Sequence, residues 1–266
     1  MSSNEKVTIL INSCEAFSDM WENIIFLYDK YWEGHPRLIL LSDKAKNDKF
    51  NKYLLCFDKE MSDRLIGAVT SIQTEFVFLS FDDYYPKNHV NSALFSQLIE
   101  EMSMQDIDYC RLFNKPRCKT KKNRNLEYRY LSLTNYYEVN FYPSIWKKEA
   151  LLKVLKNHEE IWKSEARLTR RAREESLKCI TRTNKGLFEF VDVVRKGKYL
   201  RSAYRYLKRN DLYISDRKIR TIPETIKLNL RIFISDITPK PIKDLMKKMV
   251  SRKEKKFYSD YADTED

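Results

Sequence analysis

Residues 75–86 read Glu-Phe-Val-Phe-Leu-Ser-Phe-Asp-Asp-Tyr-Tyr-Pro, and they carry the clearest information on the fold. Residues 76–81 form a strongly apolar run of strand length, which the aspartates, tyrosines and proline end abruptly. A short apolar run of this kind is typical of a strand that is buried on both faces. Ligands of open α/β sheets bind beyond the carboxyl ends of such strands. The stretch therefore predicts a buried strand with Asp82 and Asp83 at its ligand-binding end.

The segments around this stretch alternate between strand and helix patterns. Apolar runs predict strands at 7–11, 37–41, 53–57 and 109–113, and apolar residues at helical spacing predict helices over about 17–31, 63–72 and 92–104. Ser62 is placed to cap the helix 63–72. The alternation predicts an α/β protein with a largely parallel, twisted sheet that is flanked by helices.

The second half of the chain has a different pattern. Residues 126–133 and 136–141 predict a β-hairpin, and the period then becomes helical after Pro143, with Trp146 on the first predicted helix and 161–172 as the next. The remainder is mostly helical and basic in pattern. We find no internal repeat and no sharp change of composition.

The composition excludes several classes of protein. Of the 266 residues, 42% are hydrophobic and 13% aromatic, so the chain can bury a core and is not a disordered segment. It has 4 Gly and no phosphate-loop or dinucleotide fingerprint, and its 5 Cys include no CxxC pair that would suggest zinc. The apolar run near the N-terminus is too short for a secretory leader, so we expect reduced thiols in the cytoplasm.

The formal net charge of +12 is unevenly distributed. Residues 1–112 contain 11 basic and 18 acidic residues, which leaves 39 basic and 20 acidic residues in 113–266. The second half therefore has a net charge of +19, and such a surface attracts phosphates, nucleic acid or an anionic membrane face.

Asp82 and Asp83 are the first candidate site. Two adjacent carboxylates at a strand end can hold a hard divalent cation, which can in turn bridge to a diphosphate. The alternative is a simple turn, because Asp-Asp before Tyr-Tyr-Pro also suits a loop.

Several short segments share their order along the chain with a known family. Ile9 to Cys14 come first, Ser62-Asp63-Arg64-Leu65 precede Asp82-Asp83-Tyr84-Tyr85, and Tyr142 to Leu151 and Trp162 to Glu165 follow. In this order they resemble bacterial glycosyltransferases of the GT-A type, which act in capsule, exopolysaccharide or lipopolysaccharide synthesis. Tyr85 stands where the family has Phe, and the likeness extends intermittently over about residues 7–200.

The resemblance implies a Rossmann-like domain that binds a nucleotide diphosphate sugar, with UDP-sugars favoured. It places the donor near Ser13, Asp63, Arg64 and Asp82, and a Mn²⁺ or Mg²⁺ ion on Asp83. An arginine on the first turn of a helix at the strand ends can also pair with a phosphate on physical grounds. The alternative is a charge pair on the helix surface.

Glu165 is the candidate catalytic base. A transferase that inverts the sugar needs a carboxylate to take the proton of the acceptor hydroxyl, and the Trp-x-x-Glu pattern of the family matches Trp162 and Glu165. Lys163-Ser164 replaces a bulkier pair of the family. The alternatives are that Glu165 caps the helix or pairs with Arg167, with Glu159 and Glu160 as nearby substitutes.

Lys198 is the last donor-site candidate. Arg195-Lys196-Gly197-Lys198 precedes a predicted helix over 199–207, and backbone amides at a helix N-terminus together with cations form an anion site. The family often has a Gly-Lys element here, whereas a simple turn is the alternative.

Residues 240–256 carry many lysines on a predicted helix with an apolar face, a pattern typical of a helix on an anionic membrane surface. A solvated helix or a disordered tail is the alternative. We therefore divide the chain into a catalytic domain, 1–200, and a helical basic C-terminal region, 201–266. We expect the protein on the cytoplasmic face of the cell membrane.

The leading hypothesis is a metal-assisted, inverting sugar transfer to a lipid-linked or growing surface glycan. The first alternative is a basic nucleic-acid-binding protein. The sequence contains no RNA-recognition aromatic motif, helix-turn-helix or zinc framework, so we expect no nucleic-acid partner. The second alternative is a non-catalytic membrane adaptor.

Overall fold

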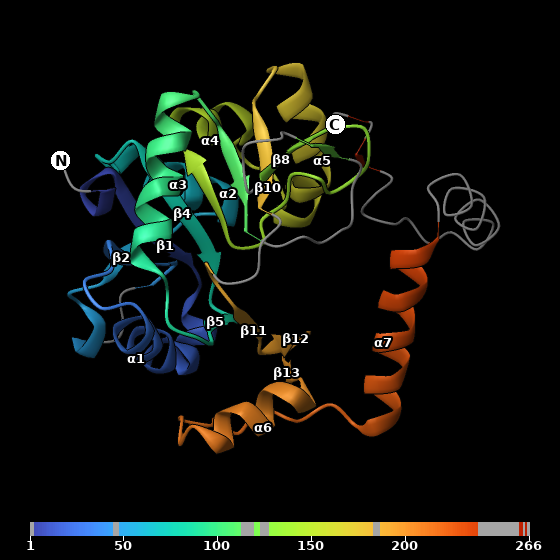
Figure 1. Ribbon diagram of the computed structural model, residues 1–266. Helices are drawn as coiled ribbons and strands as arrows, with labels where there is room; N and C mark the ends of the chain where they lie inside the picture. Colours follow the sequence, from blue (N-terminus) through green and yellow to red (C-terminus); the bar gives the residue numbers. More distant parts are fainter. Residues whose placement is uncertain are drawn as a thin grey trace.

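A computed structural model of the chain describes residues 3–44, 48–112, 120–122, 128–182, 187–238, 261, 262 and 264. Within these residues the chain forms a mixed sheet with helices on both faces (Figure 1). The strands are β1 (Val7–Asn12), β2 (Arg37–Ser42), β3 (Leu54–Cys56), β4 (Phe76–Phe81), β5 (Tyr84–Pro86), β6 (Tyr109–Arg111), β7 (Thr120–Lys122), β8 (Tyr128–Leu131), β9 (Ser144–Lys147), β10 (Cys179–Arg182), β11 (Phe190–Asp192), β12 (Val194–Arg195) and β13 (Lys198–Tyr199).

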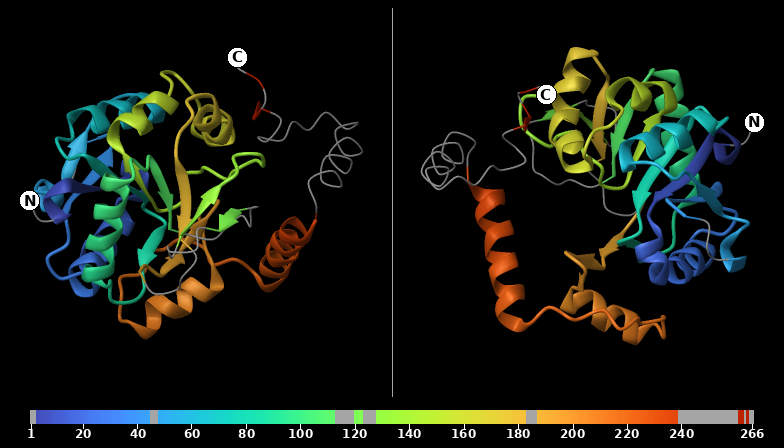
Figure 2. Two further views of the ribbon diagram at one scale, coloured as in Figure 1. Left: turned by 45° about the horizontal axis from the view of Figure 1, so that its top comes forward. Right: turned by 180° about the vertical axis from the view of Figure 1, so that it is seen from behind.

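The helices are α1 (Trp21–Tyr31), α2 (Met61–Ser71), α3 (Ser92–Met104), α4 (Lys148–Val154), α5 (Ile161–Glu174), α6 (Arg201–Arg209) and α7 (Ile222–Ile237), with short 3₁₀ turns η1 (Ser3–Lys6), η2 (Glu15–Met20) and η3 (Asp48–Phe50). Helix α7 stands apart from the sheet in all three views (Figures 1 and 2). None of the described helices is both long and apolar enough to cross a bilayer.

The main sheet has the strand order β3-β2-β1-β4-β9-β6-β10-β8-β7. Strands β3, β2, β1 and β4 are parallel neighbours, whereas β9 is antiparallel to both β4 and β6. The expected α/β, Rossmann-like sheet flanked by helices is confirmed. Its parallel half is the part that the strand and helix alternation predicts.

The two faces of β1 explain why the sheet is buried on both sides. Ile9 and Ile11 pack into the core that α1 and α3 cover, while Leu10 packs into the core under α2, α4 and α5. All residues of β1 are buried, as the continuous apolar pattern predicts for a central parallel strand. This packing brings the carboxyl ends of β1 and β4 to the same edge of the sheet.

Three expectations for secondary structure are wrong. Residues 136–141 form turns and not the second strand of a hairpin, and β8 pairs with β7 and β10 instead. Trp146 lies on β9 in the middle of the sheet and not on a helix, because its indole packs against Tyr109 at a centroid distance of 4.4 Å. The helix α2 begins at Met61, and Ser62 accepts a hydrogen bond from the backbone of Glu159 instead of capping the helix.

The C-terminal region packs in part against the sheet domain. Ala203 and Leu207 of α6 are buried in the core under α1 and α3, and Asn23 exchanges two hydrogen bonds with the backbone of Tyr213. The lysine-rich residues 240–256, which carry the expectation of membrane binding, lie outside the described residues. The division at residue 200 stays a prediction.

Candidate active site

Asp82 is fixed at the carboxyl edge of the sheet by the end of β1. The Ser13 hydroxyl donates to Asp82 Oδ2 and accepts from the indole nitrogen of Trp21 at 2.7 Å. Asp82 is buried, and this burial raises the pKa of its carboxyl to about 7, although the Ser13 hydrogen bond acts in the opposite direction. Asp82, which follows β4, is therefore held in place by the hydrogen-bonded side chains of Ser13 and Trp21.

Asp83 is brought together with Asp192, which the sequence did not single out. After β4 the chain turns into β5, which pairs with β11 so that Tyr84 faces Asp192, and the Val193 N–H donates to the Asp83 carbonyl at 2.8 Å. Burial raises the pKa of Asp83 well above its usual range, and the charges of Asp82 and Asp192 add to this shift. The turn between β4 and β5 thus brings the carboxylates of Asp82, Asp83 and Asp192 close together.

The two carboxylates Asp83 and Asp192 each keep one buried oxygen, Oδ1, without a hydrogen-bond partner among the described residues. The other oxygen of Asp192 accepts from Arg195 Nε, which partly offsets the rise in pKa that burial causes. Buried oxygens of this kind are costly unless a further group satisfies them.

Glu165, on α5, lies near Tyr142, which forms an aromatic pair with Tyr84. Its Oε1 accepts from the backbone N–H of Phe141 at 3.2 Å, and burial raises the pKa of its carboxyl. The adjacent Tyr142 packs edge-on against Tyr84 at a centroid distance of 5.6 Å. Burial raises the pKa of Tyr142, and the charges of Glu165 and Asp192 add to this rise, so both carboxylates lie near this tyrosine.

Arg64 joins the same edge, whereas Asp63 does not. The guanidinium of Arg64 is buried and donates from Nη2 to the Ser13 carbonyl at 3.1 Å, so it lies at the end of β1. Asp63 accepts from the backbone of His158 at 3.1 Å and contacts its imidazole at 2.9 Å. The structure therefore places Asp63 as a link between α2 and the segment before α5.

Lys198 is also engaged elsewhere. Lys196 and Gly197 have φ values of 52° and 71° and form the tight turn between β12 and β13, so Gly197 does not begin a helix. The expectation of a helix N-terminus at this point is wrong, because α6 begins only at Arg201. Lys198 Nζ donates to Glu224 at 2.6 Å, and it is the hairpin partner Arg195 that reaches the carboxylates.

Arg217 is a second residue that sequence reasoning missed. It donates to both carboxylate oxygens of Asp19 at 2.6 Å, and its guanidinium lies 4.3 Å from the ring centroid of Phe17. Its charge also acts to lower the pKa of Asp82. Arg217, in the segment after α6, therefore contacts η2, which follows β1, and nothing local in the sequence predicts this contact.

The carboxylates at this edge fit a cation that a substrate shares. The structure describes no cluster of three or more metal-ligating His, Cys, Asp or Glu side chains, so it offers no all-protein cage in the part that it describes. Mg²⁺ and similar hard ions are commonly held by one or two carboxylates together with substrate phosphates. The unsatisfied oxygens of Asp83 and Asp192 match this second arrangement.

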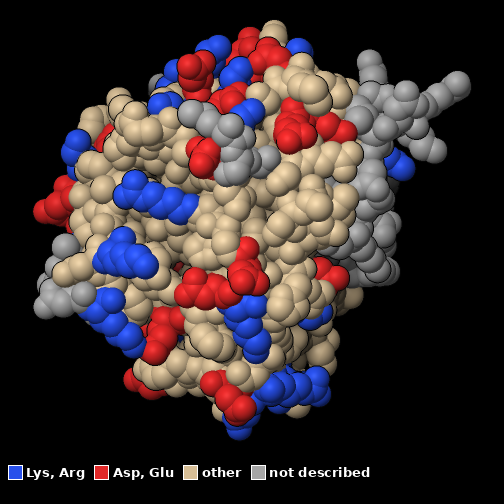
Figure 3. Space-filling model, turned by 60° about the vertical axis from the view of Figure 1, so that its left-hand side comes forward, with Lys and Arg blue, Asp and Glu red and all other residues tan. Residues whose placement is uncertain are grey.

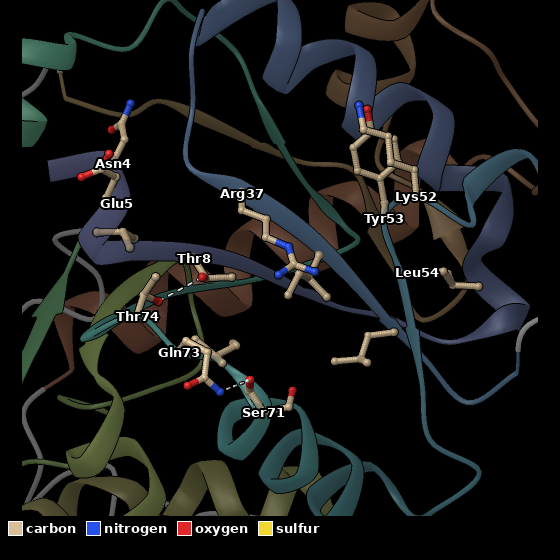
Figure 4. A pocket seen from close by; sticks show the side chains of 14 residues that line it. Asn4, Glu5, Thr8, Arg37, Lys52, Tyr53, Leu54, Ser71, Gln73 and Thr74 are labelled. Carbon is tan, nitrogen blue, oxygen red and sulfur yellow. Dashed lines mark hydrogen bonds between the residues drawn. The ribbon is translucent and has the colours of Figure 1, made fainter. Parts of the chain in front are cut away.

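A separate cavity of about 390 Å³ lies at the opposite edge of the sheet (Figure 4). It is lined by the amino ends of β1 and β2, and the Arg37 side chain points into it. The polar groups Thr8 and Thr74 hydrogen-bond to each other at 2.9 Å, and Gln73 donates to the Ser71 carbonyl. We place the candidate site at the carboxyl edge, because the buried carboxylates with raised pKa values are there and ligands of open α/β sheets bind there.

No protein-family model matches the sequence, and no curated protein matches it at a significant level. Among solved structures, the chain is similar to Staphylococcus aureus TarS 1–349 in complex with UDP-GlcNAc, with a TM-score of 0.49 and 15% identity over 73% of this chain and 60% of that chain. A longer TarS structure gives a TM-score of 0.48 and 13% identity over 69% of this chain and 36% of that one.

The chain is also similar to a CMP:2-keto-3-deoxy-manno-octonic acid synthetase complexed with CTP, with a TM-score of 0.46 and 12% identity over 70% of this chain and 93% of that chain. The matched region thus spans only about a third to three fifths of the TarS chains. The fold assignment rests on the sheet topology of this chain, and its function is argued from its own side chains.

Proposed function

We propose that the protein transfers a sugar from a nucleotide diphosphate sugar, with UDP-sugars favoured, to a glycan or lipid-linked acceptor. The observation that carries the proposal is the convergence of two incompletely satisfied carboxylates, Asp83 and Asp192, with the partly buried Glu165 across the Tyr84–Tyr142 pair. The resemblance to GT-A glycosyltransferases supports the same assignment. In this proposal Ser13, Arg64 and Asp82 line the donor site.

A Mn²⁺ or Mg²⁺ ion would be held by Asp83 and Asp192 and would neutralise the charge that develops on the leaving diphosphate. Glu165 takes the proton of the acceptor hydroxyl while that oxygen forms a bond to the anomeric carbon and the bond from this carbon to the diphosphate breaks. The products are the extended glycan, the nucleoside diphosphate and the protonated carboxyl of Glu165. Attack opposite the leaving group inverts the anomeric centre. Trp162 is 55% exposed one turn before Glu165 and offers an aromatic face for an acceptor sugar.

We also propose that α7 contributes to attachment at the cytoplasmic face of the membrane. Ile222, Ile226 and Leu230 recur every four residues on α7 and are 59%, 61% and 55% exposed. Such a line of exposed aliphatic side chains on a helix is typical of an interfacial helix. This placement would bring the site close to a lipid-linked acceptor of a capsule, exopolysaccharide or lipopolysaccharide pathway.

Purified protein tests the proposal directly. We expect UDP to raise the melting temperature only when Mn²⁺ or Mg²⁺ is present, and a panel of nucleotide sugars to include one that is hydrolysed or transferred. If no nucleotide sugar reacts and no nucleoside diphosphate stabilises the protein, the proposal is wrong.

The nucleic-acid alternative predicts a different result, namely tight retention of RNA or DNA at physiological salt. On the face shown in Figure 3, lysine and arginine side chains lie among aspartates and glutamates, and the described side chains form no continuous basic field there. Retention that disappears at moderate salt, together with UDP stabilisation, supports the transferase.

A further inference from the structure

Tyr261, Ala262 and Thr264, which we call the C-terminal segment, lie on α5. Arg167 Nε donates to the carbonyl of Tyr261 at 3.3 Å, and Arg170 Nη2 donates to the carbonyl of Thr264 at 3.4 Å. Ala262, between them, is only 2% exposed. The contacts are made across more than ninety positions of sequence, so local chain geometry does not account for them.

The ring of Tyr261 is held by two cations of the same helix. Lys163 Nζ lies 4.9 Å and the Arg167 guanidinium carbon 6.0 Å from the ring centroid, which is the distance range of cation–π contacts. Lys163, Arg167 and Arg170 follow one another at helical spacing and form one face of α5, which we call the basic face. The sequence around Tyr261 is acidic, with Asp260, Asp263, Glu265 and Asp266, and so complements this face in charge.

The basic face belongs to the helix that carries Glu165. Arg167 uses a further nitrogen, Nη1, to donate to Glu159 at 2.6 Å, and the Glu159 backbone N–H donates to Ser62 at 3.0 Å. Arg167 therefore joins the C-terminal segment to Glu159, two residues before α5, and through Glu159 to the first turn of α2, where Arg64 is located. The C-terminal segment thus braces the helix on whose opposite side Glu165 contacts Phe141.

We propose that Tyr261, Ala262 and Thr264 are a positioning element of the active site: they dock on the basic face of α5 and hold the helix so that Glu165 keeps its contact with Phe141. The partner of this surface is the chain's own C-terminal segment. The catalytic part of the inference rests on the proposed function, whereas the docking part does not.

Hydrogen exchange in the chain of residues 1–266 tests the docking without any need for activity. The amide of Phe141 donates to Glu165, so its protection reports the orientation of that side chain. We expect Tyr261→Ala to accelerate its exchange about fivefold or more relative to the core amide of Leu10, with a parallel change along α5. Tyr261→Phe, which keeps the ring, and Tyr213→Ala, which removes an exposed ring elsewhere, should leave the exchange unchanged. Arg170→Gln, which removes the Thr264 contact, serves as a second and milder variant.

Kinetics then separates positioning from a general effect on folding. Tyr261→Ala should lower kcat several-fold with little change in the KM of the donor, and it should have no further effect in a Glu165→Gln background. Unchanged Phe141 exchange in both Tyr261→Ala and Arg170→Gln would overturn the inference, as would equal loss of kcat in the presence and absence of Glu165. If no nucleotide sugar reacts, the proposed function fails while the exchange data still decide whether the segment docks.

Discussion

Asp83 and Asp192 lie side by side because the β5–β11 ladder pairs Tyr84 with Asp192 and ties the Val193 amide to the Asp83 carbonyl. Both carboxylates have a buried oxygen without a partner in the described residues, and the charge of Asp192 contributes to the raised pKa of Asp83. Like charges that are held together in this way destabilise the ligand-free protein. A cation shared with a diphosphate would relieve this repulsion in the proposed complex.

Asp83→Asn is therefore expected to have opposite effects on stability and on binding. Removal of one buried charge should raise the melting temperature of the ligand-free protein by about 2 °C, because roughly 1 kcal/mol corresponds to such a shift in a chain of this size. The same change should abolish the extra stabilisation that Mn²⁺ gives in the presence of UDP. Thermal unfolding with and without UDP and Mn²⁺ measures both effects. Asp211→Asn, away from the site, is the control, and a Mn²⁺-dependent UDP shift that persists in Asp83→Asn contradicts the assignment.

Glu165→Gln should lower kcat by about 10²–10⁴ while the stabilisation by UDP is kept, because the change removes a base and not a donor contact. Burial raises the pKa of Glu165, and only the ionised carboxylate accepts a proton. The rate should therefore rise with pH as the carboxyl ionises, with a midpoint above the usual 4.5, and Glu165→Gln should lack this limb. The pH profile of kcat/KM measures it. Glu160→Gln, in the segment just before the helix, is the matched control, and a profile that keeps the limb in Glu165→Gln would assign the base to another residue.

The parts of the fold that local patterns predict are those whose burial is continuous. Strands β1, β2 and β4 and helix α3 were expected from apolar runs and periodicity, and Asp82 and Asp83 from the abrupt end of one such run. Strand β9 has only four residues and is followed at once by α4, so the apolar period of the helix hides it. Its position between β4 and β6 is set by tertiary packing of Trp146.

The site was predicted in part for the same reason. Ser13, Arg64 and Asp82 stand at the ends of predictable elements, and the structure brings them together. Asp192 and Arg217 come from segments of the second half that have no periodic pattern, and each reaches the site through a long-range pairing that the sequence does not encode locally. Charged residues in such loops cannot be distinguished from solvated ones without the fold.

Arg217 and Asp19 form a bidentate pair that fastens the segment after α6 to the edge of the sheet. Their side chains are only 15% and 22% exposed, so solvent screens the pair less than a surface ion pair. We expect a coupling free energy of about 1–2 kcal/mol in a double-mutant cycle of Arg217→Gln and Asp19→Asn, measured by urea unfolding. The same cycle on the exposed pair Lys49 and Glu22 should give less than about 0.5 kcal/mol. Equal coupling in both pairs would contradict a fastening role for Arg217.

Substitution of Glu159 should have a large effect on the free energy of unfolding, because Glu159 is a buried carboxylate between two buried arginines. It accepts from Arg167 at 2.6 Å and from Arg171 at 2.7 and 2.8 Å, and the side chains of all three residues are at most 4% exposed. Glu159→Gln leaves two buried positive charges without a counter-charge, so the free energy of unfolding should fall by about 3 kcal/mol. Glu174→Gln, at a side chain that is 54% exposed and pairs with Arg170 at 3.5 Å, should change it by less than about 0.5 kcal/mol.

The pH dependence of the free energy of unfolding provides a second, independent test of the Glu159 carboxylate. Hydrogen bonds from Arg171 and Arg167 outweigh burial and hold the pKa of Glu159 below its usual 4.5. Its ionised form therefore stabilises the folded protein fully at pH values above 4.5, and this contribution is lost as the pH falls through the lower pKa of the folded state. Urea unfolding between pH 7 and pH 3 should show a smaller acid loss in Glu159→Gln than in the unchanged protein. An identical acid loss in both would mean that the carboxylate is not ionised between the arginines.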